Sequence, residues 1–452
     1  MSIFKDCDIR GVYPGEIDEG AAYAVGRALA TLHPGASMAV GGDHRLSTPA
    51  LKAALVRGLS DSGARVLDIG AIPTPALYWA LKHLDVDGGA TVTASHNPAR
   101  YNGVKFMFGG DPVTRADMDR VEAAVAAGRF ASGRGVVEPR DALTGYADDL
   151  ARRFCAPRPL RIVVDAGNGA MGPVAPAVLR RCGYEVEPLF CEPDGRFPNR
   201  DPNPAEYSCL GAACQRVRDT GADFGVAFDG DGDRAVFIDD RGRPVLNERS
   251  LVLFVRRLLR DGPTPVVYDQ KCSSVVPAAV RAMGGTPVLE RSGHAFIKRR
   301  FLQVGAALAG EVSGHFFFGE LGYDDGLFAA LLMAELLALS DRPLSALADA
   351  IELPPITPDL RVPCPYDRQD DWLGRVEAMA VARGGAISRL DGVRADFDDG
   401  WLLLRKSVTA EQVTLRAEAR TPERLEALLA AVAAALPDGA GDALVGGRAL
   451  NG

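Results

Sequence analysis

The chain has 452 residues, 47% hydrophobic and 24% charged, which is the balance of an ordinary globular protein large enough for several domains. Its net charge is −8 and no basic run stands out, so nucleic acid is not expected as a partner. The longest apolar stretch, from Leu327 to Leu339, contains Glu335 and is too short to span a bilayer, which argues against a membrane protein.

The cysteines indicate the compartment. There are eight, scattered along the chain, and none forms a C-x-x-C pair or stands at zinc-finger spacing from a histidine. Scattered reduced cysteines are typical of cytosolic proteins, and the N-terminal MSIFKDCDIRG has no apolar signal core. We therefore expect a cytoplasmic protein.

Short apolar strands alternate with longer amphipathic helices, and the pattern repeats. Three times an apolar run ends at an aspartate, namely Asp43, Asp165 and Asp269. Each run is followed by a helix-like stretch, a second strand, and a third strand that ends in a polar loop. Ligands of such sheets bind beyond the carboxyl ends of the strands. The repeat predicts three similar α/β units with mixed, mostly parallel sheets around a central cleft.

From about Pro355 the pattern changes. WLLLRKS and EQVTLRAEA read as strands, and TPERLEALLAAVAAAL reads as a helix, which together predict an α+β unit. The expected domains are residues 1–140, 141–243, 244–354 and 355–452.

The first polar loop is T-A-S-H-N-P, followed by Y-N-G-V-K. Ser95 in this loop could cap a helix or act as a nucleophile, and the G-x-S-x-G elbow of hydrolases is missing. Beside a metal site, Ser95 makes sense as a phosphoryl acceptor, because phosphoserine supplies oxygens to the metal. Lys105 is then a candidate to neutralise charge or to move a proton.

A glycine-rich loop, DAGNGAMG, follows the first strand of the second unit. Gly167, Gly169 and Gly172 spell the G-x-G-x-x-G dinucleotide fingerprint, with Glu192 at a tolerable distance. Glycine turns are common in α/β crossovers, and a dinucleotide site would leave the other polar loops without a role. NAD binding is therefore a minor alternative.

The second polar loop, D-G-D-G-D-R, is the strongest chemical signal. Asp229, Asp231 and Asp233 alternate with glycines that allow tight turns, which favours a hard divalent cation. The EF-hand reading fails because its sixth position requires glycine and is Arg234 here. Mg²⁺ is preferred, since it combines few protein carboxylates with phosphate oxygens.

Two further loops carry polar side chains. In G-E-V-S-G-H, Glu311 and Ser313 are expected to alternate on a short extended segment and face sugar hydroxyls, and His315 could act as acid or base. In R-K-S-V-T, Arg405 with the following hydroxyls could cradle a phosphate. Taken alone, each could also be an ordinary solvated turn.

The order and spacing of these motifs closely resemble the α-D-phosphohexomutase superfamily, in particular its bacterial phosphomannomutase/phosphoglucomutase group. The resemblance covers essentially the whole chain and includes FKDCDIRGV, TASHNPARYNGVKF, VVDAGNGAMG, PDGRFPNRDPNP, DGDGDR, GEVSGH and RKSVT. It implies a magnesium-dependent isomerase that interconverts hexose 1-phosphate and hexose 6-phosphate of mannose, glucose or both. A phosphoserine and hexose 1,6-bisphosphate would serve as intermediates, with glucose 1,6-bisphosphate as activator, and a monomer or weak dimer is expected.

The resemblance also implies a role for individual residues. The metal would be held by phosphorylated Ser95 with Asp229, Asp231 and Asp233. Transfer of the phosphoryl group and of protons would involve Arg10, His96, Lys105, Arg234 and His315. Substrate would be bound by Lys271, His294, Glu311, Ser313, Arg405, Ser407 and Thr409.

Some positions depart from the family pattern. Val408 and Glu411 stand where the phosphate loop commonly has Asn and Pro, and Cys7 stands where relatives often have Tyr. Val312 replaces the Gln typical of phosphoglucosamine mutases, which favours glucose or mannose phosphates over amino sugars. A phosphoglucosamine mutase is the first alternative, and a metal-dependent sugar phosphatase is a more distant one. A non-catalytic sensor is disfavoured because Ser95 and the metal ligands are all intact.

Overall fold

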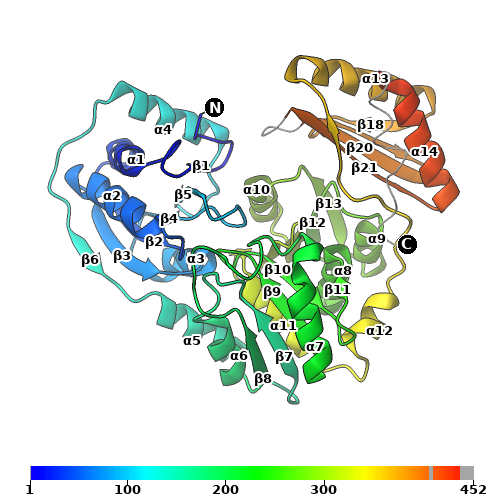
Figure 1. Ribbon diagram of the computed structural model, residues 1–452, viewed down its shortest axis with the longest axis horizontal. Coiled ribbons are helices and arrows are strands. Elements are labelled where there is room, and N and C mark those ends of the chain that lie inside the picture. The colour runs from blue at the N-terminus through cyan, green and yellow to red at the C-terminus, as the bar shows by residue number, and fades with distance from the viewer. Residues whose placement is uncertain (1, 407–410, 438–452) are drawn as a thin grey trace.

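A computed structural model describes residues 2–406 and 411–437. Its strands form four sheets in chain order, as the sequence predicts, and Figure 1 shows the fourth unit, in orange to red, beside the third. The first sheet and its helices comprise β1 (Ile9–Val12), α1 (Glu19–Leu32), β2 (Ser37–Gly42), α2 (Thr48–Asp61), β3 (Arg65–Ala71), α3 (Thr74–His83), β4 (Gly88–Val92), β5 (Tyr101–Phe108), α4 (Arg115–Ala127) and β6 (Val137–Pro139).

The second and third units repeat this arrangement. The second contains α5 (Leu143–Arg153), β7 (Arg161–Asp165), α6 (Ala175–Arg181), β8 (Glu185–Leu189), η1 (Tyr207–Leu210), α7 (Gly211–Thr220), β9 (Phe224–Phe228), β10 (Ala235–Ile238) and β11 (Pro244–Val245). The third contains α8 (Asn247–Leu258), η2 (Leu259–Asp261), β12 (Pro265–Asp269), α9 (Val275–Ala282), β13 (Thr286–Glu290), α10 (His294–Val304), β14 (Leu308–Gly310), β15 (Phe316–Phe318), β16 (Tyr323–Asp324), α11 (Gly326–Ala338) and α12 (Leu344–Asp349).

The three sheets share one strand order. The central run is β3-β2-β4-β5 in the first unit, β8-β7-β9-β10 in the second and β13-β12-β14-β15 in the third. In each run the first three strands are parallel and the fourth is antiparallel. The loop between the third and fourth strands therefore lies at the carboxyl edge of every sheet, where ligands of α/β proteins bind. The prediction of three similar units with mixed, mostly parallel sheets is confirmed.

The fourth unit is different, as predicted. It contains β17 (Leu360–Pro363), η3 (Tyr366–Arg368), α13 (Gln369–Ala382), β18 (Ala386–Ser388), β19 (Val393–Phe397), β20 (Gly400–Lys406), β21 (Gln412–Ala419) and α14 (Pro422–Ala435). Its sheet is wholly antiparallel, in the order β17-β21-β20-β19-β18. Side chains of α13 and α14 pack on this sheet around a separate small core. This is the expected α+β fold.

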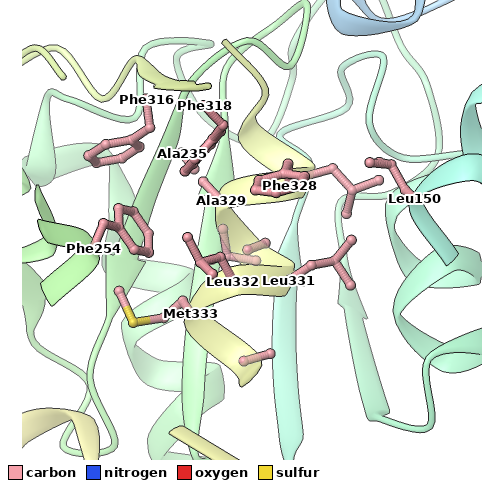
Figure 2. Packing of buried hydrophobic residues seen from close by; sticks show 14 of the residues in the cluster. Leu150, Ala235, Phe254, Phe316, Phe318, Phe328, Ala329, Leu331, Leu332 and Met333 are labelled. Atoms are coloured by element: carbon pink, nitrogen blue, oxygen red, sulfur yellow. The ribbon is translucent and has the colours of Figure 1, made fainter. Parts of the chain in front are cut away.

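One apolar helix joins the second and third units. Helix α11 is the apolar stretch singled out in the sequence, and it is buried on nearly all sides, as expected of a helix without a polar face. Figure 2 shows its side chains between Phe254 and Phe316 on one side and Leu150 of α5 on the other. The ring of Phe328 also packs 5.1 Å from that of Phe154. This continuous core fixes the two units against each other.

Among the described helices, none is long and apolar enough to cross a membrane.

Candidate active site

The first three units meet at a cavity of about 110 Å³. Six predicted site residues line it, namely Arg10, Ser95, Lys105, Arg234, His294 and His315. A larger cavity of about 620 Å³ lies between α4 and α10, but none of the predicted site residues lines it. The chemistry expected from the sequence therefore converges at the smaller cavity.

Ser95 lies in the loop between β4 and β5. It is 2% exposed and has a φ of +48°, a left-handed conformation that is uncommon for a residue with a side chain. This conformation directs the hydroxyl toward the second unit, where Ser95 Oγ donates a 2.8 Å hydrogen bond to Asp229 Oδ2. His96 Nδ1 lies 3.4 Å from the same oxygen. Burial, with the nearby Arg234 and Arg10, holds the pKa of His96 well below its usual value, so this imidazole is neutral.

A buried arginine holds the serine loop. Arg45 is 1% exposed and donates hydrogen bonds to the backbone carbonyls of Ser95 (2.7 Å) and Asn97 (2.6 Å). It also donates to the carbonyls of Pro98 and Tyr101, and it pairs with Asp43 at 3.1 Å. The guanidinium offers five donors in a fixed plane, which suits several carbonyls at once. These bonds stabilise the uncommon backbone conformation at the serine.

The DGDGDR loop, residues 229–234, is the candidate metal loop and follows β9 directly. Asp229, Asp231 and Asp233 are all 0% exposed, and one oxygen of each lies within 4.8 Å of the others. Burial, with the neighbouring Asp233 and Asp231, raises the pKa of Asp229 well above its usual value. A Cβ at Gly230 would lie 2.5 Å from the carbonyl oxygen of Ser95, so only glycine lets the two loops approach this closely.

The three carboxylates fit a divalent cation. Asp231 Oδ1 and Asp233 Oδ1 are buried and have no hydrogen-bond partner in the described chain. Unpartnered buried oxygens are costly, and like charges this close repel one another. A hard cation bound by these oxygens removes both penalties, and oxygen ligands are those that Mg²⁺ prefers.

Lys105 lies against the remaining oxygens of this cluster. Its ammonium donates to Asp231 Oδ2 at 2.8 Å and to Asp233 Oδ2 at 2.7 Å. Burial alone would lower the pKa of Lys105, but the two carboxylates raise it well above its usual value. Lys105 is therefore cationic, which suits charge neutralisation better than proton transfer. Thr74 donates to Asp231 at 2.6 Å and completes the packing.

A relay of polar side chains lies across the cavity. Arg234 Nε donates to His315 Nε2 at 3.0 Å, and His315 Nδ1 contacts Asp324 Oδ2 at 2.8 Å. The other oxygen of Asp324 contacts His294 Nε2 at 2.9 Å. Since Nε2 of His315 accepts a hydrogen bond, its ring proton is on Nδ1 and points at Asp324. Burial would raise the pKa of Asp324, but the two histidines hold it well below its usual value.

The GEVSGH loop differs from its expected local structure. An extended segment was predicted, but residues 311–314 form a turn, closed by a 3.1 Å hydrogen bond from Gly314 N–H to the carbonyl of Glu311. The cause is the reversal from β14 into the antiparallel β15. The turn brings Ser313 Oγ to 3.4 Å from Glu311 Oε2, so both side chains share one side. Glu311 Oε1 accepts from Gly293 N–H at 2.8 Å.

Of the predicted residues toward the C-terminal end, Lys271 and Arg405 are described by the structure and do not line the cavity. Lys271 pairs with Asp359, and Arg405 pairs with Asp391 at 2.8 Å. Ser407 and Thr409 lie outside the described residues. Lys271 and Arg405 were both expected to contact substrate. In this structure each of them is instead paired with a carboxylate of the protein.

Comparison with known proteins identifies the family. The four units match, in order, the models for phosphoglucomutase/phosphomannomutase α/β/α domains I (residues 1–132), II (144–242) and III (247–353) and for the C-terminal domain (361–435). The phosphomannomutase/phosphoglucomutase of Pseudomonas aeruginosa is 37% identical over 431 residues, which are 94% of this chain and 93% of that protein. The chain belongs to the phosphoglucomutase/phosphomannomutase family. The family predicted from the motif order is thereby confirmed.

Other members of this family are equally similar. The phosphoglucomutase of Neisseria gonorrhoeae is 37% identical, covering 94% of both chains. The phosphomannomutase of Salmonella montevideo is 36% identical, covering 93% of this chain and 95% of that one. A crystal structure of a family member from Burkholderia thailandensis superposes with a TM-score of 0.90 at 34% identity, covering 99% and 98% of the two chains.

Within this phosphoglucomutase/phosphomannomutase fold, the glycine-rich loop has a structural role. Gly167 has a φ of +52°, and a Cβ there would lie 2.6 Å from the guanidinium carbon of Arg200. Arg200 donates to Asp165 Oδ2 at 2.8 Å and to the carbonyl of Phe228 at 2.6 Å. It therefore holds the end of β9, next to Asp229, and fills the space beside the glycines. This packing disfavours the NAD alternative.

The sequence did not single out Arg45, Arg200 or Asp324 at this site. The signal for Arg45 was present, because it stands two residues after the strand-ending Asp43, as Lys271 does after Asp269. Asp324 had a weaker signal, a pair of acidic residues before a helix that is apolar except for Glu335.

Proposed function

We propose that this family member interconverts the 1-phosphate and 6-phosphate of glucose, mannose or both through a phosphorylated Ser95 and a hexose 1,6-bisphosphate. The observation that carries the proposal is the 2.8 Å contact of Ser95 Oγ with Asp229, beside carboxylates with unpartnered oxygens. The printed names of the relatives, phosphomannomutase and phosphoglucomutase, support the same reaction class, an intramolecular phosphoryl transfer.

Asp229, Asp231 and Asp233, with an oxygen of phosphorylated Ser95, would hold Mg²⁺. The ion would neutralise the charge of the phosphoryl group as it moves. The surrounding protein provides cations for the same purpose, because phosphoryl transfer depends mainly on positioning and charge stabilisation. We assign this role to Arg10, Lys105 and Arg234, all of which line the cavity.

In the first half-reaction a sugar hydroxyl oxygen attacks the phosphorus of phosphorylated Ser95. The new oxygen–phosphorus bond forms as the bond to Ser95 Oγ breaks. We assign removal of the hydroxyl proton to His315 Nε2 once the substrate hydroxyl displaces its hydrogen bond from Arg234 Nε, because Asp324 holds the proton on the opposite ring nitrogen. Because the sugar loses one proton and Ser95 gains one, the protons balance over the transfer. The bisphosphate then turns and returns its other phosphoryl group to Ser95.

Recognition would come from the third and fourth units. Glu311 and Ser313 share one side of a turn, which suits two neighbouring sugar hydroxyls. The substrate and the phosphate that is not being transferred would be bound by Lys271, His294, Arg405, Ser407 and Thr409.

Glucose 1,6-bisphosphate would serve as activator because it can phosphorylate an unloaded Ser95. All eight cysteines are free, in keeping with the cytoplasmic location that we propose.

A coupled assay tests this function. Glucose 1-phosphate and mannose 1-phosphate are each supplied with Mg²⁺ and catalytic glucose 1,6-bisphosphate, and formation of the 6-phosphates is followed. Turnover of either sugar is expected, and turnover of both would establish dual specificity. Turnover of glucosamine 6-phosphate alone would indicate a phosphoglucosamine mutase, and release of inorganic phosphate without isomerisation would indicate a phosphatase.

A further inference from the structure

A fourth cation lines the catalytic cavity beside Arg10, Lys105 and Arg234. It is Lys298 of α10, which is only 2% exposed. It lies four residues after His294, so the two side chains share one face of the helix, and both line the cavity. The motifs that indicated the other site residues do not include Lys298.

Lys298 differs from the other three cations in its partners. Those three each have a carboxylate nearby, respectively Asp8, Asp231 at 2.8 Å and Asp229 at 3.9 Å. In the described part of the chain, the side chain of Lys298 has no ion pair and no hydrogen bond. Its ammonium instead lies 3.8 Å from the centre of the Tyr78 ring, which belongs to α3 of the first unit.

A buried ammonium without an anionic partner is costly. Burial lowers the pKa of Lys298 to about 8, although Asp324 acts in the opposite direction. The contact with an aromatic ring offsets only part of such a cost. The site would be stabilised by an anion that enters the cavity, and sugar phosphates are dianionic near neutral pH.

We propose that Lys298 is a phosphate-binding residue of the cleft, which contacts the phosphate oxygens of the hexose phosphate and of the bisphosphate intermediate. The inference rests on the proposed function and deepens it. The charge argument supports it: the paired cations are already balanced by protein carboxylates, whereas the bisphosphate brings a second phosphate group. Lys298, a cation in the cavity without an ion pair, would neutralise part of that additional charge. The competing explanation is a purely structural contact between α10 and α3.

The test compares Lys298→Met with wild type, using glucose 1-phosphate turnover and calorimetric binding of glucose 1-phosphate. Loss of a charged hydrogen bond should raise KM and the dissociation constant by about 10- to 100-fold, while the melting temperature stays unchanged or rises. Lys82→Met is the matched control, because this lysine of α3 is nearby but lies outside the cavity and donates to the carbonyl of Leu321. An unchanged KM in Lys298→Met, or a loss of stability with no loss of affinity, would overturn the inference.

A second variant, Lys298→Arg, provides a readout that a structural role would not affect. The charged or titratable groups that face Lys298 are Tyr78 and Lys82 of α3, Lys105 of β5, Asp233 of the metal loop and Asp324 of β16. These groups are the same in wild type and variant, so the difference between the two pH profiles isolates residue 298. Wild-type KM should rise above pH 8 as the lysine loses its proton, whereas arginine stays charged and KM stays flat to pH 9. Coincident profiles would contradict the proposal.

The two proposals fail separately. If wild type turns over no hexose phosphate, the proposed function is wrong. Calorimetry with glucose 1-phosphate then still decides about Lys298, because equal affinity of wild type and Lys298→Met would remove it from the binding site.

Discussion

The two halves of the site are built differently. In the chemical half, formed by the loops of the first and second units, Ser95 and Asp229 are almost fully buried and contact each other directly. In the recognition half, formed by the third and fourth units, the side chains of Lys271 and Arg405 are 13% and 22% exposed and pair with carboxylates. The groups proposed to react are thus fixed by the protein, and the groups proposed to bind substrate are held by partners that can be exchanged.

The difference has a physical reason. Phosphoryl transfer requires that water be excluded and that the reacting atoms be held in register. An intermediate that turns around needs contacts that form, break and form again. Partly exposed ion pairs contribute only about 0–1 kcal/mol, so a phosphate dianion can displace them at little cost.

The largest effect is expected at the centre of the chemical half. Ser95→Ala removes the proposed phosphoryl acceptor, so turnover should fall by at least about 10⁴-fold, because no other group can replace a lost nucleophile. Calorimetric affinity for glucose 1-phosphate should be largely retained. Measurable transfer of radiolabelled phosphate from glucose 1,6-bisphosphate to the Ser95→Ala protein would show that another residue is the acceptor.

The next effect concerns the metal loop. Asp231→Asn removes one charge from the carboxylate cluster, so kcat should fall by about 10²-fold or more, and the Mg²⁺ concentration for half-maximal rate should rise. Asp219→Asn, on the outer helix α7, is the matched control and should behave like wild type. An Asp231→Asn enzyme with an unaltered Mg²⁺ dependence would break the metal assignment.

The support behind the serine can be tested with Arg45→Lys. Lysine has three donors and cannot serve the four carbonyls and the carboxylate that Arg45 contacts. Misplacement of the serine loop should lower kcat by about 10- to 100-fold with little change in KM. A change in KM alone would show that Arg45 affects binding and not the position of Ser95. Arg57→Lys on α2 serves as the control.

The recognition half should respond in the opposite direction. Asp359→Asn removes the carboxylate that pairs with Lys271, which frees this cation for substrate. KM for glucose 1-phosphate should fall by about 2- to 5-fold, the scale of a partly exposed ion pair. A rise in KM would mean that Asp359 orients Lys271 for binding and does not compete with the ligand.

The smallest expected effect is on the stability of the chemical half, measured as a melting temperature. Asp325 is buried behind the chemical half, where Tyr146 donates to it, and burial raises its pKa to about 7. Because the unfolded chain loses this proton near pH 4 and the folded chain near pH 7, the carboxyl lowers stability progressively as pH rises between these values. Relative to wild type, Asp325→Asn should therefore gain about 2 °C in melting temperature between pH 5 and pH 7. A gain that stays constant over this range would exclude the titration of Asp325 as its cause.

Much of this architecture could be predicted from the sequence. The strand-ending aspartates indicated the repeat, and the structure gives them a common role, since Asp43, Asp165 and Asp269 each accept a hydrogen bond from the backbone N–H two residues later. The DGDGDR spacing indicated the carboxylate cluster because its three aspartates lie within one short loop. Signals of this kind are local, and so they are visible in sequence.

The residues that hold the site loops in place could not be predicted from the sequence, and the reason is physical. Arg45 and Arg200 act on backbone carbonyls that lie far along the chain, and a carbonyl leaves no mark on the residue type that carries it. Lys298 was overlooked because a lysine on an amphipathic helix is normally expected to face solvent. The turn at Glu311 was mistaken for a strand because the reversal into β15 is set by sheet pairing.

The position of β1 in the first sheet has a consequence of its own. In the second and third units, the strand that pairs with the fourth strand of the central run is β11 or β16, and it comes after that fourth strand in the chain. In the first unit the corresponding strand is β1, which comes before all strands of the central run. The first unit is thus a circular permutation of the other two. The permutation delivers Arg10 to the cavity from the beginning of the chain. A deletion or rigid fusion that disturbs residues 2–12 would therefore damage a sheet edge and the candidate catalytic cavity together.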